Sequence, residues 1–214
     1  MSRTVSDAVS GVGGLLLSGA TLGVAALRRA PKPLHPRGEV WQGVLTREGG
    51  ASSRVGVAWL DEPGHDDVLV RRSAAVGLPA WSWDIQGLAL RLPQWEGADI
   101  LLASTGAGPW SRFVLLPARA ARISGYTSLL PYPTPVGPVF LRAEPAEKER
   151  HVLSYALGRG DWVRFGELRL IARSPEDPSF DPVRSPHPEL GNYRWVERLR
   201  APAYVSARRS RGEQ

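Results

Sequence analysis

The chain has 214 residues, and 27 Lys and Arg against 21 Asp and Glu give a formal net charge of +6. This length can bury a sizeable core and favours one domain with an N-terminal appendage. The absence of cysteine excludes disulfides, thiolate catalysis and zinc fingers. The basic residues are nearly all Arg and form no basic helix with interleaved aromatics, so we expect no nucleic-acid partner. A mildly basic protein suits an anionic membrane surface or an anionic cofactor equally well.

The first segment, residues 1–33, is predicted to be an apolar helical arm. Its centre, Ala8–Leu27, carries no charge and is long enough to span a bilayer, although its Gly, Ser and Thr content makes it a weak hydrophobe. Gly19 and Gly23 have a spacing that suits close helix packing. Three interpretations stay open: a membrane-associated helix, a helix docked on the domain or on a partner subunit in a homo-oligomer, and a cleaved signal peptide.

After a Pro-rich joint at residues 31–36, the pattern is typical of a β protein. The 19 prolines and 23 glycines favour a loop-rich fold. Strands are predicted at Glu39–Thr46, Val55–Leu60, Val68–Ser73, Leu88–Leu92, Asp99–Ser104, Val139–Glu144, Glu167–Arg173 and Tyr193–Arg200. About eight strands in mostly adjacent order are enough for a closed antiparallel barrel, so the predicted fold class is α+β, mainly β, with a few short helices.

Three further segments have other patterns. Ala146–Leu157 is the best helix candidate of the domain, with Pro145 before its first turn and Gly158 after its end. Phe113–Ser124 fits a strand or a helix. Pro131–Pro138 is a proline-punctuated loop that we expect to lie outside any sheet.

The stretch Val68–Pro93 is the centre of the predicted barrel. In its first strand Val68 and Val70 point one way, while Arg71 and Ser73 point the other. A barrel interior that holds a polar ligand needs an arginine and a serine on one face. We therefore expect Arg71 and Ser73 to line a cavity, with an edge strand and an exposed arginine as the alternative.

The four histidines show no recognised metal-binding spacing, so we predict no metal ligated by protein side chains alone. His65-Asp66-Asp67 resembles the His-Asp pair of metal phosphohydrolases, but Pro63-Gly64 places it in a turn before a strand. His151 and His187 are predicted to lie on the surface. His35 precedes the first strand, where its side chain can reach a barrel mouth.

Several segments resemble, in the same order, the barrel of the haem catalases. His35-Pro36-Arg37-Gly38 resembles the segment that carries the distal histidine. Val70-Arg71-Arg72-Ser73 resembles the strand with a haem-propionate arginine and a serine that hydrogen-bonds the distal histidine. Asp84–Leu92 and Asp99–Leu102 resemble the next two strands, and Phe180-Asp181-Pro182 with Trp195–Pro202 resembles the end of the barrel.

The chain also resembles short actinobacterial-type proteins that share this barrel and are often labelled phosphodiesterases. Asp84–Leu92 and Tyr126–Tyr132 carry that resemblance. No residue set for phosphodiester hydrolysis accompanies it.

The catalase resemblance implies a haem pocket in which His35 is the distal acid/base and Ser73 holds its ring. Arg71, Lys32 and Arg37 would bind the cofactor. The segment with the proximal tyrosine ligand has no counterpart, and neither Ala103 nor Ser104 is the distal asparagine. An axial ligand would come from Tyr126, Tyr132, Tyr204 or a partner chain. Classical catalase activity is therefore not expected.

The domain prediction that follows is an arm at residues 1–33, a catalase-like barrel at 34–206 and a basic tail at 207–214. The leading functional hypothesis is a cytoplasmic, minimal haem-pocket protein that acts on a peroxide or another small molecule as a weak peroxidase. The alternative is a haem-free barrel that binds a lipid-like or apolar ligand at a membrane or partner. The third is phosphodiester hydrolysis at His65 and Asp66.

Overall fold

The computed structural model describes residues 38–49, 54–79, 81–147 and 149–199. The strands in this part of the chain are β1 (Gly38–Arg47), β2 (Gly64–Ala74), β3 (Gln86–Leu92), β4 (Ala98–Ser104), β5 (Tyr126–Thr127), β6 (Tyr132–Thr134), β7 (Gly137–Pro145), β8 (Arg150–Leu157) and β9 (Val163–Arg173). The helical elements are α2 (Ala58–Asp61), η1 (Ser111–Phe113), η2 (Ala120–Arg122) and residues 194–199.

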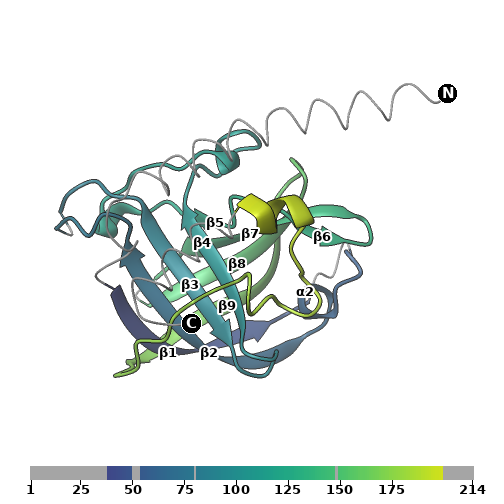
Figure 1. Cartoon of the computed structure of the whole chain (residues 1–214), viewed down its shortest axis with the longest axis horizontal. Helices are drawn as coiled ribbons and strands as arrows, with labels where there is room; N and C mark the ends of the chain where they lie inside the picture. The colour runs from purple at the N-terminus through teal and green to yellow at the C-terminus, as the bar shows by residue number, and fades with distance from the viewer. Residues whose placement is uncertain (1–37, 50–53, 80, 148, 200–214) are drawn as a thin grey trace.

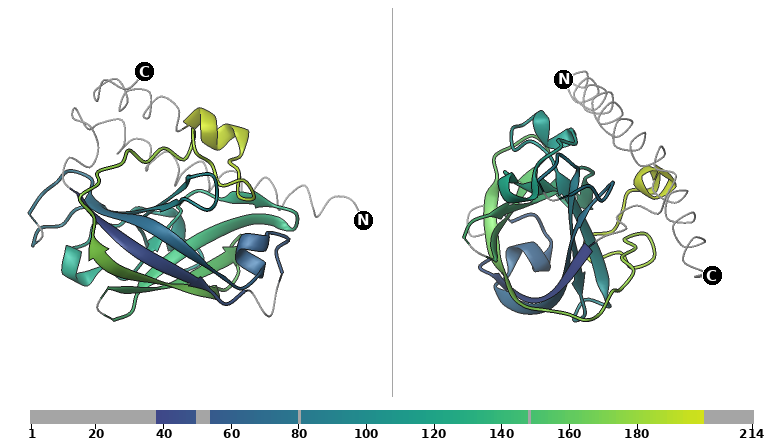
Figure 2. Two further views of the ribbon diagram at one scale, coloured as in Figure 1. Left: turned by 90° about the horizontal axis from the view of Figure 1, so that it is seen from below. Right: turned by 90° about the vertical axis from the view of Figure 1, so that its left-hand side faces the viewer.

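The strands close into a barrel (Figure 1). They form one antiparallel sheet in the order β5-β4-β3-β2-β1-β9-β8-β7-β6, and β5 also pairs with β7. This extra pairing leaves β6 outside the ring, so eight of the nine strands enclose the interior. The right-hand view of Figure 2 looks into the closed ring. Closure leaves those eight strands without a free edge. The predicted mainly β closed antiparallel barrel is therefore confirmed, whereas the predicted arm lies outside the described residues.

The alternation of side chains decides which face of each strand is inside. On β2, Val68 and Val70 are 3% and 0% exposed, and they pack with the leucines of β3. The register places Val70 between Trp41 of β1 and Leu90 of β3, so these side chains share the interior. The strands predicted around residues 39–46, 68–73, 88–92, 99–104, 139–144 and 167–173 are confirmed as β1, β2, β3, β4, β7 and β9.

The predicted helix at Ala146–Leu157 is wrong. Residues 150–157 form β8, which pairs with both β7 and β9. His151, Leu153 and Tyr155 are 5%, 2% and 1% exposed on the interior face of β8. The hydrogen bonds and burial that two neighbouring strands supply outweigh a weak local helix preference.

The predicted strand at Val55–Leu60 is also wrong. The Asp61 carboxylate accepts hydrogen bonds from the backbone N–H groups of residues 55–57 at 2.7 to 3.2 Å, which folds the segment back on itself. Gly56 has a φ of 76°, a conformation that glycine adopts without strain. The single turn α2 follows and buries Trp59 in the core. Local bonds from an aspartate compete with strand formation in this way.

Three other segments differ from expectation. Phe113–Ser124 contains short 3-10 turns and two isolated β-bridges, at Leu115 and Ala118. The described residues of the strand predicted at Tyr193–Arg200 form no strand, because residues 194–199 are helical. Val196 of that helix packs against Leu130. Within Pro131–Pro138, β6 pairs only with β7, so its Pro133 occupies an edge strand, where a missing N–H is tolerated.

A strap, residues 174–190, crosses the outside of the barrel after β9 (Figure 2, left). It begins where Ser174 N–H donates to Val40 O at 2.8 Å, and Asp99 N–H donates to Ser185 O at 2.8 Å farther along. The expected end of the barrel at residues 180–182 and 195–202 is thus corrected, because β9 is the last strand and residues 180–182 belong to the strap.

The barrel has two ends that differ in character. The Asp66 end carries α2 and the β1–β2, β3–β4 and β8–β9 connections. The Arg72 end carries the start of β1, the β2–β3 loop and the β7–β8 turn. Figure 1 places α2 and the β2–β3 loop on opposite sides of the molecule. Among the described residues, no helix combines the length and apolar character needed to cross a bilayer.

Candidate functional site

Arg71 and Ser73 share a face as predicted, but that face is the outside of the barrel. Ser73 pairs with Gly38 and Gly87, and Arg71 with Val40 and Ala89, all in the row opposite to Val70. The expectation that they line an interior cavity is therefore wrong. The valines occupy the interior because they continue the apolar core of neighbouring strands, and the next interior position on β2 holds Arg72.

On the outside of the barrel, the Arg71 side chain packs closely against the strap and the start of β1. Its guanidinium forms an ion pair with Asp177 of the strap at 3.3 Å. A Cβ added to Gly38 would lie 2.5 Å from Arg71 Nε, so the arginine lies directly against the start of β1. The structure thus brings Arg71 and Ser73 together beside Gly38. The other predicted site residues, Lys32, His35 and Arg37, lie outside the described residues.

The candidate axial ligands among the described residues do not share a face of the sheet with Arg71 and Ser73. Tyr126 and Tyr132, two of the candidate axial ligands, both belong to the interior core, on the opposite side of the sheet. Burial raises the pKa of Tyr126 to about 12, so its phenol is a neutral group of the core. Tyr204 lies outside the described residues.

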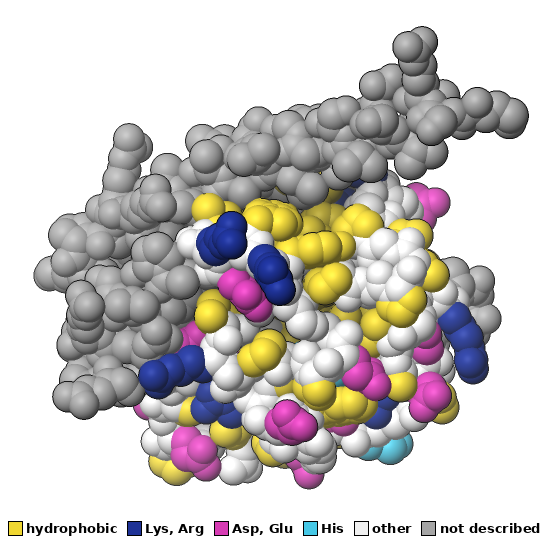
Figure 3. All heavy atoms as spheres, turned by 45° about the vertical axis from the view of Figure 1, so that its right-hand side comes forward, with side chains coloured by type: hydrophobic (Ala, Val, Ile, Leu, Met, Phe, Trp, Pro, Cys, Tyr) yellow, Lys and Arg dark blue, Asp and Glu magenta, His cyan; other side chains and the backbone are white. Residues whose placement is uncertain are grey.

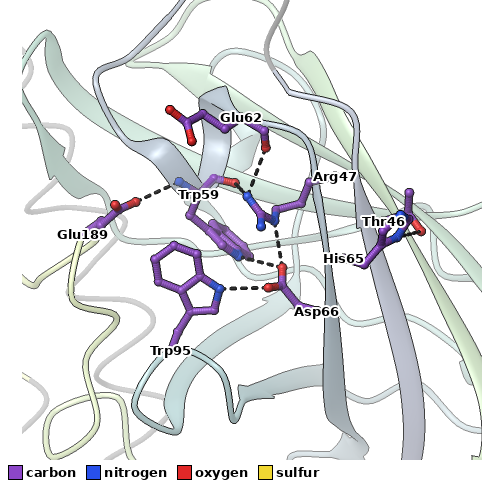
Figure 4. A network of polar contacts seen from close by, with 8 residues as sticks. All are labelled: Thr46, Arg47, Trp59, Glu62, His65, Asp66, Trp95 and Glu189. Carbon is purple, nitrogen blue, oxygen red and sulfur yellow. Dashed lines mark hydrogen bonds and ion pairs between the residues drawn. The ribbon is translucent and has the colours of Figure 1, made fainter.

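At the Asp66 end a buried ion pair organises the closure (Figure 4). Asp66 is 3% exposed, and its carboxylate accepts hydrogen bonds from Arg47 Nε at 2.8 Å, Trp95 Nε1 at 2.9 Å and Trp59 Nε1 at 3.3 Å. Arg47 also donates to Glu62 O at 3.0 Å. Every oxygen of the carboxylate has a donor, which is what a buried charge requires.

His187 of the strap completes this closure, and its predicted surface position is wrong. Its ring is 1% exposed and lies 4.7 Å from the Trp95 ring and 5.0 Å from the Trp59 ring, measured between centroids. Nδ1 accepts a hydrogen bond from Glu189 N–H at 3.2 Å. Burial lowers the pKa of His187 to about 4, so the ring is neutral at pH 7.

The His65-Asp66 pair does not form a common site. Asp66 points into the barrel, whereas His65 is exposed and its Nδ1 lies 3.2 Å from Thr46 Oγ1, away from Asp66 in Figure 4. Within the described ranges, no group of three His, Asp or Glu side chains could hold a metal ion.

The Arg72 end contains the second buried histidine, and here too the predicted surface position is wrong. His151 is 5% exposed, with its ring centroid 6.2 Å from that of Tyr126. Burial, and then the nearby charge of Arg72, lower the pKa of His151 to about 4. Arg72 forms an ion pair with Glu149 and stacks over Trp41, with Cζ 5.3 Å from the ring centroid. The alternation of His151, Leu153 and Tyr155 was the sequence signal for this interior position.

The two ends differ in how well their polar atoms are paired. At the Arg72 end, Trp41 Nε1, Arg72 Nε and His151 Nδ1 are buried without a hydrogen-bond partner among the described residues. At the Asp66 end, both oxygens of the Asp66 carboxylate have donors, and His187 Nε2 is buried without a partner among the described residues. Buried donors of this kind cost free energy unless a ligand or water accepts their bonds.

The β2–β3 loop at the Arg72 end is organised by Asp84. This residue is 4% exposed, and its carboxylate accepts backbone hydrogen bonds from residues 76, 77, 78 and 85 at 2.7 to 3.2 Å. Asp84 also exchanges two backbone bonds with Ala118 of the β4–β5 connection, at 3.2 and 2.9 Å. The Asp84 carboxylate therefore holds the backbone of residues 76–78, although the side chains of Val76 and Leu78 are exposed.

Comparison with known proteins supports the fold alone. No family model matches the chain, and no curated protein is similar in sequence. Among solved structures, a fungal catalase superposes with a TM-score of 0.57 at 13% identity, covering 87% of this chain and 61% of that one. A bacterial catalase gives 0.57 at 12% identity, covering 84% and 57%. This chain thus spans about three fifths of the length of these catalases and has a catalase-like barrel.

Substituting Asp66→Asn should destabilise the protein by about 3 kcal/mol or more, because it leaves the buried Arg47 charge without its counter-ion. Urea unfolding at neutral pH measures this. Asp67→Asn, at the adjacent exposed position, is the matched control and should change the stability by less than about 0.5 kcal/mol. Equal stabilities of the two variants would contradict the role of Asp66.

The two buried histidines make the protein less stable as the pH falls from about 6.5 towards 4. Their folded pKa values of about 4 lie below the ordinary value of 6.5, so the unfolded chain binds more protons in this window. The loss at pH 5 should be on the order of 2 kcal/mol for each histidine. Unfolding at pH 7 and pH 5 should show a smaller loss in His151→Gln and in His187→Gln, and an unchanged loss in His65→Gln.

Proposed function

We propose that this protein is a haem-free barrel that binds the surface of an anionic membrane through its β2–β3 loop. The observation that carries the proposal is a loop whose large apolar side chains are exposed to water. Val76, Leu78, Trp81 and Trp83 are 67%, 44%, 76% and 61% exposed. Water-exposed groups of such side chains mark an interaction surface, and tryptophan favours the interface between lipid headgroups and acyl chains.

The loop is preorganised for such a contact. Because the Asp84 carboxylate accepts hydrogen bonds from the backbone N–H groups of residues 76–78, this part of the loop backbone is already ordered before it binds. Less conformational entropy is then lost on docking. The backbone bonds between Asp84 and Ala118 also connect the loop to the second half of the β4–β5 connection, which carries Arg119 and Arg122.

The charge beside the loop complements an anionic membrane. Arg119 and Arg122 are exposed on the β4–β5 connection, and Arg119 stacks over Trp83, with Cζ 5.5 Å from the ring centroid. The sequence from residue 100 to residue 143 contains no Asp, Glu or Lys, so Arg119 and Arg122 have no acidic neighbour along this stretch. Each basic residue near an anionic bilayer contributes about 1 kcal/mol to binding.

The face turned towards the Asp66 end has a different composition. In Figure 3 the Lys and Arg side chains of that face occur in small separate groups with Asp or Glu nearby. This mixed charge favours the Arg72 end, with its loop, as the side that meets the membrane.

Vesicle sedimentation with the full chain tests the proposal. The protein should bind vesicles that contain phosphatidylglycerol and should not bind pure phosphatidylcholine, and added salt should weaken the binding. Replacing Trp81 and Trp83 together by Ala should weaken it by about tenfold or more, because each ring loses most of its apolar contact.

The control is Trp110→Ala, which removes a tryptophan that is 52% exposed, stacked on Arg159 of the β8–β9 connection near the Asp66 end. It should leave vesicle binding unchanged. If the Trp81/Trp83 variant binds as tightly as the wild type, the loop is not the docking surface. Absence of any vesicle binding would contradict the proposal and favour a protein partner.

An absorbance spectrum distinguishes the proposal from the haem-pocket hypothesis, which predicts a Soret band. We expect that protein purified from haem-supplemented cells shows no stoichiometric Soret band, because the tyrosines at positions 126 and 132 face the interior, away from Arg71. A pyridine haemochrome assay measures the content. Close to one haem per chain, lost in His35→Ala, would overturn this prediction and restore His35, Ser73 and Arg71 as the site.

A further inference from the structure

We infer that the interior of the barrel at its Arg72 end binds one small oxyanion, a carboxylate or a phosphate. The site consists of Trp41, Arg72 and His151, with Tyr126 beside the histidine. This inference does not depend on membrane binding, because it concerns the interior of the barrel and not the β2–β3 loop.

The first argument is that three buried nitrogen atoms lack partners at one end of one interior. They are Trp41 Nε1, Arg72 Nε and His151 Nδ1, and none has a hydrogen-bond partner within the described part of the chain. His151 is 5% exposed, so bulk water does not satisfy it freely. Since buried polar atoms are nearly always paired, a missing partner is indicated here.

The second argument is the chemistry of the unpaired groups. The indole and the guanidinium can only donate hydrogen bonds, and the neutral imidazole can donate from Nδ1 in one tautomer. A ligand that satisfies all three must therefore offer several acceptors and needs no donor. Carboxylates and phosphates meet that requirement, and hydrogen bonds to a charged group are stronger than neutral ones.

The third argument is that the four residues come together across the barrel. Arg72 stacks over Trp41, at 5.3 Å between Cζ and the ring centroid, and its charge acts on both His151 and Tyr126. The His151 and Tyr126 ring centroids lie 6.2 Å apart. The residues come from β1, β2, β8 and β5, and they face the same interior.

Glu149 is the internal competitor of such a ligand. Its carboxylate already pairs with Arg72 through Nη2, from a turn in which Glu149 has a φ of 61°. The guanidinium thus holds one carboxylate on its outer edge and keeps Nε unpaired. A bound oxyanion would share the arginine with Glu149, so removing the glutamate charge should strengthen the binding of the ligand.

The test is a titration of the full chain, without vesicles, followed by the ¹⁵N resonance of the Arg72 side-chain Nε. Sodium acetate and sodium phosphate are the probes, and sodium chloride keeps the ionic strength constant. We expect a saturable shift with at least one of the two probes. No saturable shift with either probe would overturn the inference and leave a site that holds water alone.

Variants show whether the interior groups are responsible, with calorimetric titration as their readout. Arg72→Gln and His151→Gln should each weaken binding by about tenfold or more, whereas Glu149→Gln should tighten it several-fold. The matched control is Arg150→Gln, which removes a charge next to His151 on the outer face, where Arg150 pairs with Glu167 at 3.6 Å. An equal loss in this control, or no tightening in Glu149→Gln, would contradict the inference. If Arg72→Gln does not fold, the other two variants still decide it.

Discussion

The closure of the barrel at one end depends on the burial of a single carboxylate. Asp66 lies inside the ring and receives hydrogen bonds from Arg47 and from the indoles of Trp59 and Trp95. These donors come from β1, from α2 and from the β3–β4 turn, so one charge connects three segments distant in sequence. The strap adds His187 between the two indoles, which also anchors the segment that follows β9. A buried ion of this kind contributes specificity, because any other arrangement leaves a charge unpaired.

The two ends of the barrel differ in what their polar groups do. Those at the Asp66 end hold the fold together, and those at the Arg72 end are available for a ligand. At the Asp66 end the buried carboxylate has a donor for each of its oxygens, so its polar contacts account for the closure of the barrel there. The Arg72 end has unpaired donors inside and apolar side chains outside, and neither feature stabilises the isolated chain. In a closed barrel, a binding site is expected at the end where buried polar groups lack partners within the chain. Both the membrane-binding loop and the oxyanion site are proposed at that end for this reason.

Sequence patterns predicted the barrel fold correctly, but they assigned some of its individual segments wrongly. Alternation identified six of the strands, because apolar residues at every second position have a single physical meaning in a sheet. Val55–Leu60 alternates as well, yet the bonds from Asp61 fold it into a turn. Residues 150–157 suggested a helix, although His151, Leu153 and Tyr155 alternate. Which face of β2 lies inside depended on its neighbours in the ring, and this pairing is not encoded in the strand itself.

The likeness to the catalases concerns the fold alone. Arg71 and Ser73 keep the order that a haem site would require, but Asp177 of the strap pairs with Arg71 at 3.3 Å. Tyr126 and Tyr132 lie on the other side of the sheet, within the core. A cofactor between them would have to pass through a sheet whose interior is filled by apolar side chains. The same barrel can thus support a different function, because the interior Arg72 has a buried donor without a partner and a histidine nearby, whereas the outer Arg71 pairs with Asp177.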